Sequence, residues 1–100
     1  MIHKFLKTVT VAGGSGSVNT LSVDGMCRML YIKPTTATTT YKLNITDSDG
    51  DVIKNWDFTK ATLRDYTPLI LYGVSTINIT NSTVDENFTV KLLVEELMGI

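Results

Sequence analysis

The sequence predicts an all-β fold, an antiparallel β-sandwich of the Ig-like or jelly-roll-like kind with about seven or eight strands. Threonine, valine, isoleucine and tyrosine are abundant, and β-branched and aromatic side chains prefer pleated strands to helices. Apolar and polar residues alternate in several segments, as in strands with one buried face. Turn signals recur between these segments, at residues 13–16, Asp24-Gly25, Asp49-Gly50, Thr67-Pro68 and Asn81-Ser82.

The first three predicted strands span residues 4–12, 17–23 and 26–33. In the first, Val9 and Val11 alternate with threonines, so one face packs and the other stays hydrated. A glycine-rich loop follows it, and the second strand also alternates. The third is a nearly continuous apolar run that ends at a proline. It indicates a central strand that is either buried on both faces or presents one face to a neighbouring subunit.

The hairpin from Tyr41 to Val52 is the sharpest local signal. Within residues 39–46, apolar and polar side chains alternate strictly from Tyr41 to Thr46, which predicts a half-buried strand. Residues 47–50, Asp-Ser-Asp-Gly, supply side chains that cap their own backbone and a glycine that tolerates positive φ. The partner strand then returns over residues 51–56.

The last third of the chain continues the pattern after one irregular stretch. Residues 57–66 stay unassigned, because they suit either one helical turn or a loop that crosses between sheets. Strands are expected over residues 69–72 and 74–80, the former opened by a proline. Residues 88–95 form a long closing strand, whose outward Leu93 is exposed apolar surface unless a partner covers it.

Length and composition bound the function classes. With 100 residues, 43% of them hydrophobic, the chain suits a single β-sandwich domain over residues 1–100, with extended termini. Nine basic and ten acidic residues are scattered without runs and give a net charge of −1, so nucleic acid and membrane are not expected partners. The amino terminus does not read as a signal peptide, so synthesis in the cytoplasm is expected.

The residues offer little for catalysis. The only histidine, His3, lies near the amino terminus, and the only cysteine, Cys27, lies in the apolar run, where an inert core thiol is expected. We therefore expect a protein that is not an enzyme and has no cofactor.

Residues 47–51, Asp-Ser-Asp-Gly-Asp, superficially resemble a calcium loop. The match fails because glycine is fourth rather than sixth and the twelfth residue is Phe58 rather than glutamate. Turn stabilisation is the preferred interpretation of Asp47, Asp49 and Asp51, and a weaker cation site at the hairpin tip stays open.

A carbohydrate platform is the main alternative function, because flat aromatic rings on a sheet bind sugars. Burial in the sandwich core is the ordinary explanation for such residues. The rings concerned are Tyr31, Tyr41, Trp56, Tyr66 and Tyr72.

Four segments resemble small β-sandwich structural proteins of tailed bacteriophages. They are residues 30–34 (LYIKP), 38–47 (TTTYKLNITD), 49–53 (DGDVI) and 77–81 (INITN), within a likeness that covers about residues 26–95. The resemblance implies a virion component, most simply a head decoration (cement) protein or a head-fibre base, and transfers no catalytic residues. Head, neck and tail locations stay open.

The resemblance also implies partners. A decoration protein binds the major capsid protein or another virion protein, and such proteins often form homo-oligomers around a symmetry axis, for example trimers. The rival hypothesis is a carbohydrate- or host-surface-binding module of a tail or fibre. The termini and the last strand are the expected assembly contacts, although the termini alternatively only cover the sandwich edges. These contacts are Ile2, Phe5, Leu6, Leu93, Leu97, Met98 and Ile100.

Overall fold

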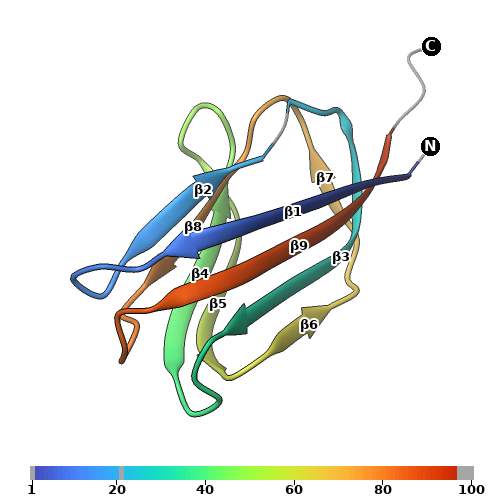
Figure 1. Cartoon of the computed structure of the whole chain (residues 1–100). Coiled ribbons are helices and arrows are strands. Elements are labelled where there is room, and N and C mark those ends of the chain that lie inside the picture. Colours follow the sequence, from blue (N-terminus) through green and yellow to red (C-terminus); the bar gives the residue numbers. More distant parts are fainter. Residues whose placement is uncertain (1, 21, 97–100) are drawn as a thin grey trace.

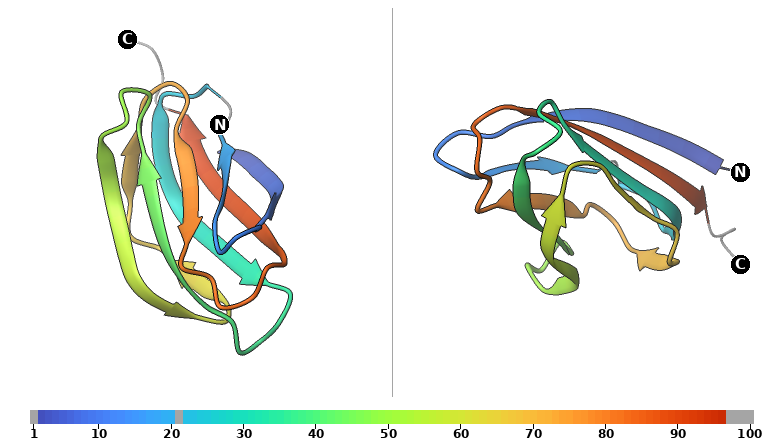
Figure 2. Two further views of the ribbon diagram at one scale, coloured as in Figure 1. Left: turned by 90° about the vertical axis from the view of Figure 1, so that its left-hand side faces the viewer. Right: turned by 90° about the horizontal axis from the view of Figure 1, so that it is seen from below.

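The computed structural model describes residues 2–20 and 22–96, without the side chain of Phe58, and consists of two antiparallel sheets packed face to face (Figure 1, Figure 2). The all-β sandwich prediction is confirmed. The strands are β1 (Ile2–Thr10), β2 (Gly16–Asn19), β3 (Gly25–Pro34), β4 (Thr40–Thr46), β5 (Val52–Lys60), β6 (Leu63–Asp65), β7 (Leu69–Leu71), β8 (Thr76–Thr80) and β9 (Asn87–Glu96).

The strand pairs nest inside one another. β4 pairs with β5, β3 with both β6 and β7, β2 with β8, and β1 with β9. The sheet orders are β1-β9-β3-β6, with β7 also on β3, and β2-β8-β4-β5. A long hairpin rolled up on itself gives this nesting, which is the order of a jelly roll once β6 and β7 are taken as one interrupted strand. The structure thus selects the jelly-roll-like of the two expected variants.

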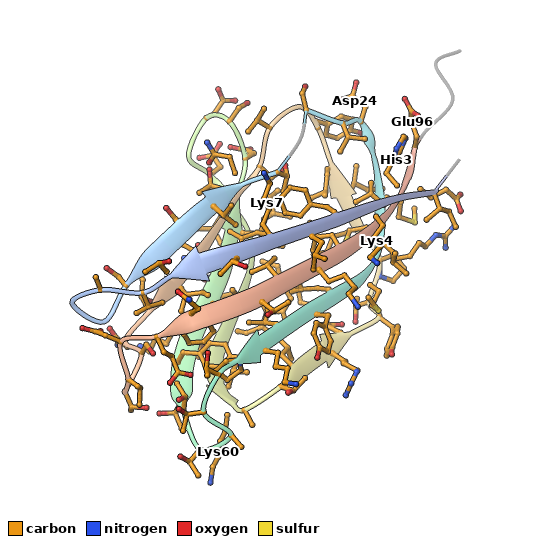
Figure 3. The ribbon with its side chains drawn as sticks, in the orientation of Figure 1. His3, Lys4, Lys7, Asp24, Lys60 and Glu96 are labelled. Carbon is orange, nitrogen blue, oxygen red and sulfur yellow. The ribbon has the colours of Figure 1, made fainter. Side chains whose placement is uncertain are left out.

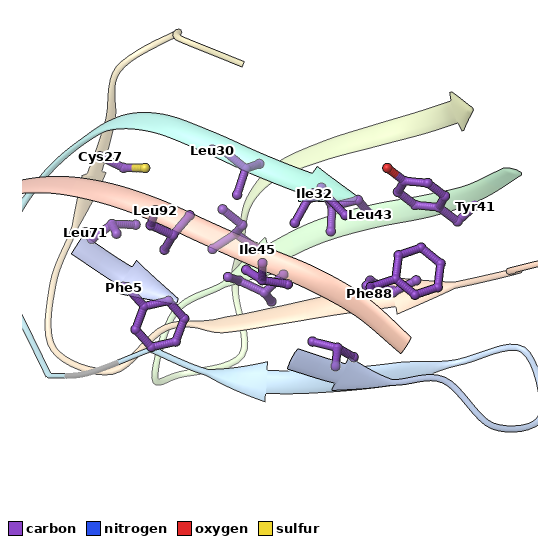
Figure 4. Packing of buried hydrophobic residues seen from close by; sticks show 14 of the residues in the cluster. Phe5, Cys27, Leu30, Ile32, Tyr41, Leu43, Ile45, Leu71, Phe88 and Leu92 are labelled. Carbon is purple, nitrogen blue, oxygen red and sulfur yellow. The ribbon is translucent and has the colours of Figure 1, made fainter. Parts of the chain in front are cut away.

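The core lies between the sheets and consists of the apolar side chains at alternate strand positions (Figure 4). The ring of Tyr41 from one sheet meets the ring of Phe88 from the other edge-on, with centroids 5.0 Å apart. The remaining buried apolar residues are Phe5, Val9, Val11, Cys27, Leu30, Ile32, Leu43, Ile45, Leu71, Ile77, Ile79, Val90, Leu92 and Val94.

The hairpin from Tyr41 to Val52 is confirmed as β4, a tight turn and the start of β5. The N–H of Asp47 donates to the carbonyl of Asp51 (2.9 Å), and Gly50 adopts a φ of 87° at the turn. The second strand is longer than expected, because β5 continues to Lys60.

The stretch left unassigned, residues 57–66, therefore contains the end of β5 and all of β6. Between them Ala61 has a φ of 58°, which turns the chain from the four-stranded sheet to the five-stranded sheet. Of the two alternatives, a helical turn or a loop that crosses between sheets, the crossing loop is correct. The alternation pattern did not predict the short strand β6.

The two sheets are close at one end of β1 and open at the other. At Gly16 a β-carbon would lie 2.6 Å from the carbonyl oxygen of Thr10, so β2 crosses β1 closely there only because this residue is glycine. Towards the amino terminus of β1, a small opening into the core lies between this strand and Thr20, Ser22 and Val23.

Candidate functional site

The outer face of the five-stranded sheet carries the main candidate site. On β9 the residues at 88, 90, 92 and 94 point into the core, so those at 87, 89, 91, 93 and 95 point outward. The strand register extends these positions into rows across the sheet. The three rows nearest the amino terminus of β1 are Ile2–Glu95–Met26–Ile70, Lys4–Leu93–Met29 and Leu6–Lys91–Tyr31–Arg64.

The apolar members of these rows are neighbours on four strands. We call this set the apolar face. Ile2 and Leu6 on β1 are 60% and 54% exposed, and Ile70 on β7 is 40% exposed. Leu93 lies half-buried near the middle, between Lys4 and Met29. The complete set is Ile2, Leu6, Met26, Met29, Tyr31, Ile70 and Leu93.

Positive charges lie between and beside the members of the apolar face: Lys4 stands between Ile2 and Leu6 on β1, and Lys91 stands between Leu6 and Tyr31 across the strands. The ring of Tyr31 lies between two of them, with the guanidinium carbon of Arg64 at 5.0 Å and the ammonium nitrogen of Lys91 at 5.2 Å from its centroid. Arg28, the extra residue of a β-bulge, forms an ion pair with Glu95 at 3.2 Å. Figure 3 looks onto this face.

The outer face of the four-stranded sheet is different in kind. Ser17, Asn78, Asn44 and Asn55 form one row across β2, β8, β4 and β5. The amide of Asn78 donates to Asn44 Oδ1 at 2.8 Å. A shallow hollow of about 250 Å³ adjoins this row and is lined by Ser17, Asn78 and Thr80 among others. We call this row of amides and hydroxyls, with the hollow beside it, the polar face.

The aromatic side chains do not form a platform. Tyr41 is buried, its hydroxyl donates to the carbonyl of Ala61 (2.8 Å), and burial raises its pKa far above the ordinary value. Trp56 is half-buried and donates from Nε1 to Asp65 (2.8 Å). Tyr66 and Tyr72 are 65% and 63% exposed but follow β6 and β7 in separate turns. Among the described residues, no row of solvent-facing rings crosses either sheet.

The expected assembly contacts separate into three groups. Ile2 and Leu6 point outward from β1 and share the apolar face with Leu93. Phe5 needs correction, because it points inward and is only 6% exposed, so it stabilises the core instead of offering a contact surface. Leu97, Met98 and Ile100 lie outside the described residues.

Sequence reasoning missed the members of the apolar face on β3 and β7, namely Met26, Met29, Tyr31 and Ile70. The run over residues 26–33 held the signal, since it suggested that one face of this strand meets a neighbour. Which residues belong to that face depends on the bulge at Arg28, where the register with β9 shifts. Alternation alone places the wrong residues outward beyond such a point.

The two residues considered for catalysis, His3 and Cys27, both make structural contacts. His3 Nε2 lies 2.9 Å from Glu96 Oε2 on the surface. Cys27 is buried, its thiol donates to the carbonyl of Met29 (3.3 Å), and burial raises its pKa to about 11. The core thiol prediction is confirmed, since at neutral pH this group is protonated and shielded.

The acidic turn has a similar explanation. Asp47 Oδ1 accepts the backbone N–H groups of Asp49 and Asp51 at 2.9 and 3.0 Å. This is the turn chemistry that the sequence favoured. Across the described residues, no cluster of three or more His, Cys, Asp or Glu side chains has the arrangement of a metal site.

The opening near the amino terminus is a cavity of about 150 Å³ between β1 and Thr20, Ser22 and Val23, and Phe5 and Leu92 are among its walls. Pockets for drug-sized ligands are typically about 300–1,000 Å³. This cavity is too small for such a ligand, and its apolar lining continues the core. In the described part of the chain, no helix is long and apolar enough to cross a membrane.

Comparisons with known proteins add little. No family model and no curated protein matches the sequence. The structure is similar to a carbohydrate-binding module, CBM36, in complex with calcium and xylotriose, with a TM-score of 0.40, 12% identity and coverage of 88% of this chain and 76% of that one. It is also similar to the enzymatically active domain of bacteriophage CBA120 tailspike protein 4, with a TM-score of 0.35, 14% identity and coverage of 92% and 15%. Both scores are low, so neither likeness carries an argument about what this chain binds.

Proposed function

We propose that this protein is a non-enzymatic assembly protein that docks onto a larger protein surface through the apolar face. The observation that carries the proposal is the contiguity of that face. Single exposed apolar side chains are normal on a protein surface, and a group of them on four adjacent strands is the feature of this surface that favours an interaction site. The exposed Ile2 and Leu6, with the more central Leu93, have the chemistry of such a contact.

The sequence resemblance over residues 26–95 favours a virion shell as the larger protein surface. In this proposal the protein is a capsid decoration protein, made in the host cytoplasm and bound to the major capsid protein or another virion protein. Jelly rolls serve in viral capsids and in lectins alike, so the fold is compatible with this role without selecting it.

Rebinding to particles tests the proposal. Particles stripped of the protein are incubated with wild type or with the double variant Ile2→Ser/Leu6→Ser, and occupancy is measured by cryo-EM and quantitative gels. Each half-exposed side chain that becomes buried contributes on the order of 1 kcal/mol, so the double variant binds roughly 30-fold more weakly. Substitution is preferable to deletion of the first residues, because deletion also removes the core residue Phe5.

Val52→Ser is the matched control, since Val52 is 50% exposed but lies on β5, in the other sheet. It should bind as wild type does. Equal occupancy for the double variant and the control, or absence of the protein from particles, contradicts the proposal.

The polar face favours a second candidate function, a carbohydrate- or host-surface-binding module. Amide and hydroxyl side chains in a row, beside a shallow hollow, offer donors and acceptors to a neutral polyhydroxyl ligand. A glycan array with wild type, Asn78→Ala and Asn55→Ala tests it. Glycan binding that Asn78→Ala abolishes supports this candidate, and no binding to any glycan removes it.

A further inference from the structure

The apolar face is too small to be a complete interface. Its rows extend over three inter-strand steps of about 4.8 Å and two side-chain repeats of about 6.8 Å, so it covers on the order of 200 Å². A standard interface buries about 800 Å² on each partner. The charged residues that border the apolar face therefore lie within any stable interface formed there, and their sign constrains the partner.

These bordering charges are predominantly positive. Lys4 lies beside Leu93, Arg64 and Lys91 lie on either side of the Tyr31 ring, and Lys33 lies in the next row. Among the described residues of this outer face, the acidic side chain is Glu95, and it is already paired with Arg28. Because the whole chain has a net charge of −1, the remaining surface is acidic and the molecule is electrically polarised.

A second copy docked through the same face is a poor partner. A two-fold contact would bring the cations of one copy close to those of the other, and opposed like charges in an interface cost several kcal/mol. Nucleic acid suits the cations but leaves the apolar rows against phosphates and sugars. A lipid surface is also a poor partner, because binding to it scales with the apolar area that becomes buried, and the apolar face covers only on the order of 200 Å².

We infer that the partner surface on the apolar face is an acidic protein surface with exposed apolar side chains, whose carboxylates pair with Lys4, Lys33 and the cations beside Tyr31. This inference rests on the proposed function and specifies the chemistry of the partner. It also predicts that salt weakens docking, since exposed charge pairs are screened at high ionic strength.

A glutamate–tyrosine copolymer serves as the probe, with polyglutamate, anionic phosphatidylglycerol vesicles and a short DNA duplex as competitors for the same face. Binding of each to the full chain is measured by biolayer interferometry at low and high salt. The copolymer is expected to bind more tightly than polyglutamate, vesicles or DNA, and Ile2→Ser/Leu6→Ser should weaken it. Tighter binding to vesicles or to DNA overturns the inference.

Charge reversal supplies the decisive comparison. Lys4→Glu/Lys33→Glu changes two exposed side chains on the outer face of the five-stranded sheet, and Lys42→Glu/Lys60→Glu makes the same change on the other sheet. Figure 3 shows Lys60 far from Lys4. The first variant should bind the copolymer roughly tenfold more weakly at low salt, and the second should stay within about twofold of wild type.

The outcomes separate this inference from the proposed function. If the Ile2→Ser/Leu6→Ser variant loses particle occupancy but Lys4→Glu/Lys33→Glu keeps it, the docking face stands and the acidic partner is wrong. If both charge variants lose copolymer binding equally, net charge alone explains the binding and the inference fails. If wild type self-associates at low salt through this face, a second copy is the partner and the inference is also wrong.

Discussion

Asp65 joins the two sheets at the edge formed by β5 and β6, and its replacement should destabilise the fold. Its Oδ2 accepts Nζ of Lys54 at 3.0 Å and Nε1 of Trp56 at 2.8 Å, both from β5, and its Oδ1 accepts the N–H of Thr67 at 2.8 Å. Asp65 itself belongs to β6 in the other sheet. The Lys54 ammonium also lies 5.0 Å from the Trp56 ring centroid. One carboxylate thus links the sheets through two donors from β5, while the third donor, Thr67, fixes the carboxylate from its own segment.

The magnitude follows from these contacts. Asp65→Asn replaces one accepting oxygen by an NH₂ group, which leaves at least one donor without an acceptor and removes the ion pair. The side chains of Lys54 and Asp65 are 28% and 18% exposed, so solvent screens the pair only partly. A buried or half-buried group left without its partner costs about 1–3 kcal/mol. We expect the free energy of unfolding to fall by about 2 kcal/mol at neutral pH.

The same carboxylate gives stability a defined pH dependence. Burial by itself raises the pKa of Asp65, but the hydrogen bonds from Thr67, Lys54 and Trp56 outweigh burial and hold the pKa well below its usual range. A folded-state pKa below the unfolded value means that the ionised group stabilises the fold. This contribution is complete above the unfolded pKa of about 3.9 and is lost as the pH falls further towards the folded-state pKa.

Urea unfolding followed by Trp56 fluorescence and by circular dichroism, at neutral pH and in steps below pH 4, measures both effects. Wild type should lose stability with acid more steeply than Asp65→Asn. Asp57→Asn is the control, because Asp57 is exposed on β5 and should change stability by less than about 0.5 kcal/mol. A change of that small size for Asp65→Asn, or an unchanged acid slope, would falsify the reasoning.

Three further predictions concern the close backbone contact at Gly25, the buried thiol of Cys27 and the loop held by Glu86. In urea unfolding, Gly25→Ala should lower the free energy of unfolding by about 1–3 kcal/mol, because the added β-carbon would lie 2.6 Å from the carbonyl oxygen of Glu95. Cys27 should react with iodoacetamide at neutral pH only as fast as the protein unfolds, since the residue is 1% exposed and burial also raises its thiol pKa to about 11. Glu86→Ala should accelerate amide exchange at Thr36, whose N–H donates to Glu86 Oε2 at 2.6 Å.

Each of these has an internal comparison. Gly14 has a positive φ of 83°, and a β-carbon added there would lie an ordinary 3.7 Å from the carbonyl oxygen of Ser82, so Gly14→Ala reports backbone strain alone. A larger loss of stability for Gly14→Ala than for Gly25→Ala contradicts the clash argument. Reaction of Cys27 at the rate of a free thiol peptide contradicts its burial. Amide exchange at Asp49, in the distant hairpin turn, should not change in Glu86→Ala, and a uniform acceleration would mean global unfolding instead.

The hairpin and the last strand illustrate what local pattern specifies well. Alternation around Tyr41 and over residues 88–95 places the buried side chains correctly, because a strand with one buried face has a strict period of two. The Asp47 turn follows equally from local chemistry, since an aspartate caps its own neighbours. The candidate site was only partly foreseen, with Ile2, Leu6 and Leu93 identified and Phe5 placed on the wrong side of the same strand.

The sequence by itself determined the all-β class, the approximate positions of most strands and the inert core thiol, because these depend on side-chain propensity, period and local turns. Only the tertiary structure decided the nesting of the strands, and with it the neighbours of Leu93. Register across the sheet, and the bulge at Arg28 above all, sets which apolar residues from β1, β3, β7 and β9 share a face. That grouping arises from contacts between strands far apart in the chain, on which local pattern carries no information.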